Sequence, residues 1–144
     1  ENINGFHFMN PITIPLIELC KRKQYSDILL NELIMSLKNY SYEVINVTDK
    51  PGFLVNRILF KEISYFFYLF EIENKSISEL KKIYKVLLKS SDPIKIVNMI
   101  GIDTSLCILE NLNKDDNNIY VPNILKDSVK KGILGYKNKK LLRI

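Results

Sequence analysis

The sequence predicts a mostly helical protein with a short α/β segment at its N-terminal end. Residues 1–48 carry short apolar stretches around one amphipathic helix, and from residue 51 onward apolar residues recur at helical spacing between capping and stop signals. The chain has 144 residues, of which 47% are hydrophobic and 26% charged, as is usual for a globular protein with a core. We therefore expect two parts, residues 1–48 and residues 49–144.

The first part is expected to follow the order strand, strand, helix, strand. Residues 5–8 and 16–20 are short apolar stretches separated by Pro11 and Pro15, which predicts two strands joined by a kinked loop. Residues 25–39 carry a helical stripe of apolar residues that Ser26 or Asp27 would cap, and residues 43–47 are typical of a strand. This order suits the edge of an α/β domain.

The second part is expected to be all helical. Residues 53–73 form a very apolar pattern, so this helix should be buried on more than one face, and its aromatic run 65–70 should lie in the core or in a dimer interface. Ser76–Glu79 is a capping box for a helix to about residue 89. The later expected elements are a helix from Asp92-Pro93 past Gly101 to about residue 110, a polar loop at 113–118, and a helix at 121–131 ended by Gly132.

Composition argues against several kinds of function. The net charge is +5, but lysines are scattered along the chain, so we predict no nucleic-acid partner, and we expect the basic residues 137–143 to form a solvated tail. No apolar run approaches the ~18 residues of a membrane span. Cys20 and Cys107 lack metal-ligand spacing, so no metal site is predicted; both should be buried thiols of a cytoplasmic protein.

The single histidine, His7, is the first candidate for chemistry, because histidine exchanges protons near neutral pH. A carboxylate follows at Glu18, and a carboxylate that reaches the far ring nitrogen would fix the histidine tautomer. On these residues alone, a structural histidine is favoured over a catalytic one.

Four segments resemble the 3-hydroxyacyl-CoA dehydrogenase family. Residues 5–11 (GFHFMNP), with Glu18, are similar to the family's G-x-H-F-F-N-P…E signature, and residues 49–57 (DKPGFLVNR) to its D-x-P-G-F-x-x-N-R motif. Residues 101–104 (GIDT) are similar to G-L-D-T. A looser match to P-S-x-L-x-x-x-V-x-x-G-x-x-G consists of Pro122, Leu125, Val129, Gly132 and Gly135.

The resemblance implies that residues 1–48 are the last strands and helix of a Rossmann-type NAD-binding domain. Residues 49–144 would be the helical C-terminal domain, which also forms a homodimer. The implied activity is oxidation of the 3-hydroxyl of a 3-hydroxyacyl-CoA, such as 3-hydroxybutyryl-CoA, to a 3-oxo group with NAD in fatty-acid metabolism. By position, His7 matches the catalytic base and Glu18 the carboxylate that orients it, while Asn56 and Asn10 match residues that line the substrate pocket.

The chain also departs from the family. The Gly-rich turn that binds the pyrophosphate of NAD is absent, and so is the family's catalytic serine, so we expect this chain alone to be inactive. The first residue is Glu rather than Met, which suggests a fragment, a processed chain or an excised domain. Asn98 stands where the family commonly has Asp, and the last motif diverges after Gly135.

Three classes of function therefore remain open from the sequence. The first is part of an NAD-dependent dehydrogenase. The second is a non-catalytic helical dimerisation module, or a degenerate homologue without activity. The third is a basic helical binding protein, which would need its Lys and Arg residues gathered on one face. Acyl chain length, the direction of the reaction and the presence of a hydratase domain are not encoded in these motifs.

Overall fold

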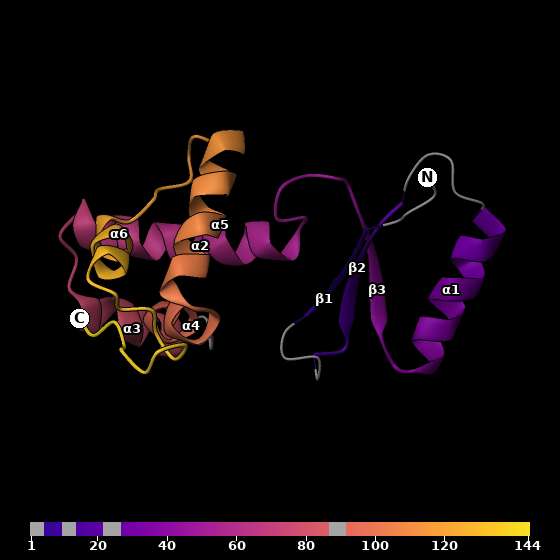
Figure 1. Cartoon of the computed structure of the whole chain (residues 1–144), viewed down its shortest axis with the longest axis horizontal. Coiled ribbons are helices and arrows are strands. Elements are labelled where there is room, and N and C mark those ends of the chain that lie inside the picture. Colours follow the sequence, from indigo (N-terminus) through magenta and orange to yellow (C-terminus); the bar gives the residue numbers. More distant parts are fainter. Residues whose placement is uncertain (1–4, 10–13, 22–26, 87–91) are drawn as a thin grey trace. The chain divides into compact units, whose positions relative to one another are not determined.

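The computed structural model describes residues 5–9, 14–21, 27–86 and 92–144. It confirms the predicted class, a mostly helical chain with a short mixed sheet near the N-terminus (Figure 1). The chain divides into two compact units, Glu1–Asn56 and Arg57–Ile144.

The first unit is a three-stranded sheet with one helix. Strands β1 (Gly5–Phe8), β2 (Leu16–Cys20) and β3 (Glu43–Val47) lie in the order β1-β2-β3, and their bounds are those expected from the sequence. β1 pairs antiparallel with β2, whereas β2 pairs parallel with β3. The parallel pair needs a crossover connection, which the helix α1 (Asp27–Asn39) supplies. β2 is the central strand, so its Ile17 and Leu19 are fully buried.

The second unit is a bundle of helices. It contains most of α2 (Val55–Glu71), followed by α3 (Ile77–Val86), α4 (Pro93–Ile100), α5 (Ile102–Asp115) and α6 (Asn123–Lys130). Capping chemistry sets several of these ends. Asp92 accepts a hydrogen bond from the Ile94 N–H at 2.8 Å and starts α4, with Pro93 in its first turn, as expected.

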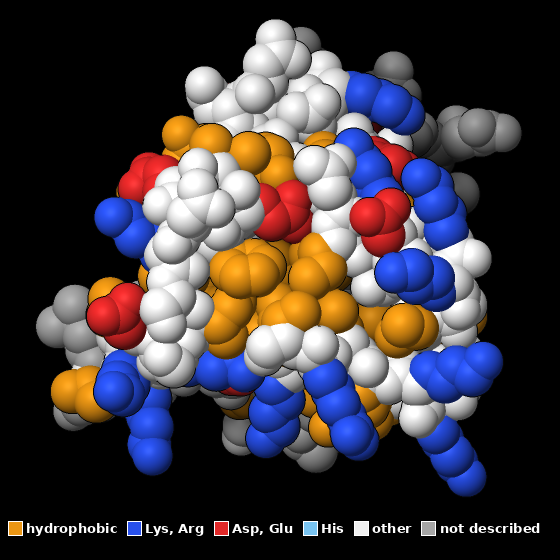
Figure 2. All heavy atoms as spheres, turned by 90° about the vertical axis from the view of Figure 1, so that its left-hand side faces the viewer, with side chains coloured by type: hydrophobic (Ala, Val, Ile, Leu, Met, Phe, Trp, Pro, Cys, Tyr) orange, Lys and Arg blue, Asp and Glu red, His pale blue; other side chains and the backbone are white. Residues whose placement is uncertain are grey.

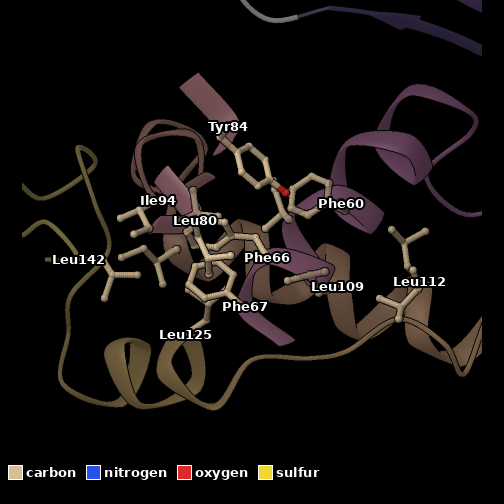
Figure 3. Packing of buried hydrophobic residues seen from close by; sticks show 14 residues of the cluster. Phe60, Phe66, Phe67, Leu80, Tyr84, Ile94, Leu109, Leu112, Leu125 and Leu142 are labelled. Carbon is tan, nitrogen blue, oxygen red and sulfur yellow. The ribbon is translucent and has the colours of Figure 1, made fainter. Parts of the chain in front are cut away.

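The core of this unit is built around α2. Phe60, Ile63, Phe66 and Phe67 recur at helical spacing and are fully buried. Side chains of the later helices pack on them, including Leu80 and Tyr84 of α3, Ile94 of α4, Leu109 and Leu112 of α5 and Leu125 of α6 (Figure 3). The aromatic run contributes two of these core residues, but its Tyr65 is 58% exposed, so α2 keeps one face outside the core.

A glutamate side chain also fixes the start of α6. Glu71, the last residue of α2, accepts hydrogen bonds from the N–H groups of Asn123 and Ile124, each at 2.9 Å. These N–H groups have no partner within their own helix, so a carboxylate from elsewhere stabilises them. The Tyr120 hydroxyl donates to the same carboxylate at 2.6 Å, and burial, with this hydrogen bond, raises the pKa of Tyr120 to about 12.

Two helix boundaries differ from those expected. The helix from Asp92 does not continue through Gly101: the backbone there has φ +107°, outside the helical range, so α4 ends and α5 begins. α5 then continues to Asp115, into the segment expected to be a loop. Ion pairs from Arg57 to Asp115 (2.6 Å) and from Lys61 to Asp116 (3.4 Å) hold this end of α5 against α2.

The expectation of a solvated C-terminal tail holds for its basic side chains, which are exposed, but is wrong for Leu142. Leu142 is buried, and the Asn98 amide holds it by accepting from the Leu142 N–H at 2.8 Å and donating to the Leu142 carbonyl at 3.0 Å. Lys137 donates to both carboxylate oxygens of Asp103, which lowers the pKa of that carboxyl. The segment after α6 is therefore part of the packed unit.

The surface of the helical unit mixes charge with apolar side chains. Figure 2 shows one face of it, on which hydrophobic side chains form a central patch bordered by Lys and Arg and by several acidic side chains. Charges of both signs thus share this face. In the described part of the chain, no helix is long and apolar enough to cross a membrane.

Two glycines in the segment after α6 provide a matched test of its packing. Both have a left-handed backbone, Gly132 at φ +67° and Gly135 at φ +78°. A Cβ at Gly132 would meet nothing within 4 Å, whereas one at Gly135 would lie 2.4 Å from the Asn98 carbonyl oxygen. We expect Gly132→Ala to cost about 1–2 kcal/mol of unfolding free energy, and Gly135→Ala to cost about 1–3 kcal/mol more because backbone must move.

Urea unfolding of the two variants measures this difference. Equal losses of stability would show that the close approach of Gly135 to Asn98 is not a constraint on the fold.

Candidate functional site

Strand pairing brings His7 and Glu18 together. The two residues lie directly opposite each other in the β1–β2 register, so their side chains share one face of the sheet. The His7 Nδ1 atom lies 2.6 Å from Glu18 Oε2. The Glu18 side chain is fully buried, whereas 31% of the His7 side chain is exposed. The contact expected from the sequence is therefore present.

The second oxygen of Glu18 binds the start of α2. Glu18 Oε1 accepts hydrogen bonds from the N–H groups of Leu54 and Val55, both at 2.7 Å. These are unpaired donors of the first helical turn, and the positive end of the helix dipole favours a carboxylate there. A turn over residues 51–54 delivers them, with Gly52 at φ +74° and a 3.0 Å hydrogen bond from the Phe53 N–H to the Lys50 carbonyl.

This arrangement selects a histidine tautomer. Because Glu18 Oε1 already accepts two N–H groups, its partner Oε2 is left as an acceptor for the His7 Nδ1–H. With the proton on Nδ1, the Nε2 atom of a neutral imidazole carries a lone pair and can accept a proton. The dyad thus has the arrangement of a general base held by a carboxylate.

The sequence also predicted two asparagines as substrate-binding residues, Asn56 and Asn10, and the structure describes only the first. Asn56 lies in the first turn of α2 and is half-buried, and its side-chain amide makes no hydrogen bond with any residue that the structure describes. It remains available to a ligand, and its substrate-binding role stays a prediction. Asn10 lies outside the described residues.

Sequence reasoning missed Phe53 at this site. Its ring centroid lies 6.1 Å from that of His7, with an angle of 43° between the ring planes. A non-glycine residue at φ +44° is an uncommon backbone conformation, and such positions cluster at functional sites. The signal in the sequence was a bulky residue directly after Gly52 in a turn.

Side-chain carboxylates occupy three helix starts that could otherwise bind a phosphate group. The succession β3, Gly52, α2 has the order of a strand, glycine turn and helix, but Glu18 occupies the free N–H groups of α2. Asp92 and Glu71 occupy those of α4 and α6 in the same way. A pyrophosphate therefore finds no free helix start at these three positions.

Metal chemistry has no visible basis in the described ranges. No group of three or more His, Cys, Asp or Glu side chains there could hold a metal ion. Cys20 is buried, as expected, but Cys107 is exposed on α5, so the expectation of two buried thiols is wrong for Cys107.

Comparison with known proteins places this chain in a family. Residues 52–142 match the model of the 3-hydroxyacyl-CoA dehydrogenase C-terminal domain. The fatty acid oxidation complex subunit alpha of Acinetobacter baylyi is 33% identical over 110 residues, which cover 74% of this chain and 15% of that protein. The chain therefore belongs to the 3-hydroxyacyl-CoA dehydrogenase family.

Solved structures agree with this assignment. The (S)-3-hydroxybutyryl-CoA dehydrogenase of Ralstonia eutropha superposes with a TM-score of 0.84 at 30% identity, over 95% of this chain and 50% of that one. An NAD+-dependent dismutase, a dehydrogenase of a pyridine carboxylic acid, shares the fold at a TM-score of 0.65 and 21% identity, over 96% of this chain and 47% of that one. The chain thus spans about half the length of these solved relatives.

The tautomer at His7 can be tested by Glu18→Gln. The glutamine carbonyl can keep the bonds to Leu54 and Val55, which turns its NH₂ group toward Nδ1. We expect the ring proton of His7 to move from Nδ1 to Nε2. Because the chain has one histidine, ¹⁵N NMR of histidine-labelled protein reports it without overlap. An unchanged tautomer would contradict the assignment of Glu18 as its cause.

Proposed function

We propose that this chain is the C-terminal part of an NAD-dependent 3-hydroxyacyl-CoA dehydrogenase that oxidises the 3-hydroxyl of its substrate to a 3-oxo group in fatty-acid oxidation. Residues 1–48 would be the end of the NAD-binding domain, and residues 49–144 the helical domain. The observation that carries the proposal is the 2.6 Å contact between His7 Nδ1 and the buried Glu18, in a chain that belongs to this family.

His7 would act as the general base in this reaction. Its Nε2 atom would take the proton of the substrate's 3-hydroxyl, and Glu18 would stabilise the imidazolium that forms. Because Glu18 is also held by two backbone N–H groups, it cannot swing away from the ring without leaving those donors unpaired. The half-buried Asn56 amide is a neutral donor for the substrate oxygen, whose charge grows as the proton leaves.

The oxidation also needs a hydride acceptor, which in this proposal is NAD. Since the sequence lacks the Gly-rich turn that binds the pyrophosphate, we assign no step of hydride transfer to its residues. We expect that turn in a separate dinucleotide-binding half, so the enzyme assay uses this chain joined to such a half.

The first test of this proposal is His7→Gln in such a two-part enzyme. In the reductive direction His7 would return its proton to the 3-oxygen, and glutamine can neither accept nor release that proton, so NADH-linked reduction of acetoacetyl-CoA should fall by about 10²–10⁴-fold. The fall in NADH absorbance measures the rate, and circular dichroism should show unchanged folding because His7 is partly exposed. Glu43→Gln, at an exposed end of β3, is the matched control and should keep full activity.

Near-normal turnover of His7→Gln would contradict the role of His7. A wild-type protein that folds, binds acetoacetyl-CoA and still shows no turnover would instead favour the degenerate homologue.

We also propose that the helical unit forms a homodimer through α2. Ile58 and Tyr65, seven residues apart on this helix, and Ile72, directly after it, are each more than 50% exposed, so an apolar stripe runs along one face. The stripe borders a hollow of about 630 Å³. Its lining combines large apolar or aromatic residues (Ile58, Tyr65, Tyr68 and Tyr120) with polar and charged ones. Packing of a second copy against this face would remove it from water.

A charge on the stripe should disrupt this dimer. Tyr65→Lys adds a like charge at two symmetry-related positions, so we expect sedimentation at tens of micromolar to show a dimer for the wild type and mainly monomer for the variant. Met99→Lys, at a 55% exposed position on α4, is the matched control and should remain dimeric. A monomeric wild type, or equal effects of the two variants, would contradict this interface.

A further inference from the structure

We infer that Phe53 is a positioning residue for His7, whose ring holds the imidazole in the orientation that points Nδ1 at Glu18. This inference rests on the proposed role of His7 as a base, but the geometry that supports it is a property of the first unit alone. No part of the family motif assigned above gives Phe53 a role in the chemistry.

The first observation is the contact of the two rings. Their centroids are 6.1 Å apart and their planes are inclined by 43°, so Phe53 packs against His7 as a tilted neighbour. The bond to Glu18 fixes one atom of the imidazole, yet the ring can still rotate about that bond. A side chain packed against the imidazole restricts this rotation, and Phe53 is in place to do so.

The second observation is the support of the Phe53 ring itself. Gly5 lies two residues before His7 on β1, and therefore on the same face of the sheet. A Cβ at Gly5 would lie 3.3 Å from Phe53 Cζ and 3.3 Å from the Cβ atom of Cys20. The ring thus lies along one face of β1, in space that a larger residue at position 5 would restrict.

The third observation is the backbone that carries the ring. Phe53 has φ +44°, a conformation that a bulky residue adopts only when its surroundings hold it there. Directly after it, the Leu54 and Val55 N–H groups bind Glu18. One three-residue segment therefore provides a ring beside the base and two donors for the carboxylate, which couples the orientation of both members of the dyad.

The apolar ring also affects solvent at the dyad. The His7 side chain is 31% exposed, so water can compete for its polar atoms, while Glu18 is fully buried. An aromatic ring beside the imidazole reduces that access and strengthens the hydrogen bond to Glu18. Loss of the ring should then weaken the preference for the Nδ1–H tautomer without removing Glu18.

The test uses the 144-residue chain labelled with ¹⁵N-histidine, in which His7 gives the single set of imidazole signals. We expect the wild type to show a protonated Nδ1 and an unprotonated Nε2 above neutral pH. Phe53→Leu should move both ¹⁵N shifts toward those of free histidine, and Phe53→Tyr, which keeps the ring, should restore the wild-type shifts. Phe6→Leu makes the same change on β1 but on the opposite face, and should have no effect.

A second variant keeps the inference testable if Phe53→Leu fails to fold. Gly5→Ala keeps phenylalanine at position 53 but adds a methyl group 3.3 Å from its ring, which displaces the ring slightly. The His7 signals should therefore shift in the same direction as in Phe53→Leu, and by less. Wild-type imidazole shifts in a folded Phe53→Leu or Gly5→Ala protein would overturn the inference.

Kinetics separate this inference from the proposed function. In the two-part enzyme, Phe53→Leu should lower kcat on the order of tenfold while KM changes little, because orientation of the base and not substrate affinity is altered. If His7→Gln leaves turnover intact, His7 is not the catalytic base. The NMR experiment still tests separately whether Phe53 orients the His7 ring. If His7→Gln abolishes turnover and Phe53→Leu changes neither NMR shifts nor kcat, the positioning role alone is wrong.

Discussion

The first unit depends on a single buried carboxylate. Glu18 is fully enclosed, and a charge in such a place is costly unless every lone pair finds a donor. It is satisfied by two backbone N–H groups at the start of α2 and by the His7 ring. The same three bonds therefore make the buried charge tolerable, begin a helix and orient the candidate base. Truncation of the Glu18 side chain would disturb all three together, whereas Glu18→Gln can keep the bonds to the helix and change only the partner of His7.

The helical unit has a comparable centre at Asn98. Its side chain donates to the carbonyls of Ile94 and Leu142 and accepts from the Leu142 N–H, and its backbone carbonyl accepts from Tyr136. An ionised aspartate at this position could not donate to either carbonyl. The asparagine that looked like a departure in sequence is thus matched to the path of the C-terminal segment. Two of the four motifs meet at Glu18, and Gly135 of the loosest motif lies against the backbone of Asn98.

Local patterns predicted the elements well because most of them are encoded by neighbours in sequence. The three strands, the Asp92 cap and the apolar stripe of α2 all follow from spacing. The contact of His7 with Glu18 also followed from the paired strands. Features that depend on distant partners were not readable: the break at Gly101, the burial of Leu142, and the packing of Phe53 against Gly5 and His7 each require the fold to be known.

The close approach of Gly135 to the Asn98 backbone has a consequence for evolution. A lineage that gave up dehydrogenation would still have to keep this glycine for as long as it kept its shape, since any side chain there collides with main chain. His7 lies on the edge strand β1 and its side chain is about one-third exposed, so packing does not require a histidine there. It could be replaced once its chemistry was no longer selected. We therefore expect the packed glycine to persist in relatives that have lost the histidine.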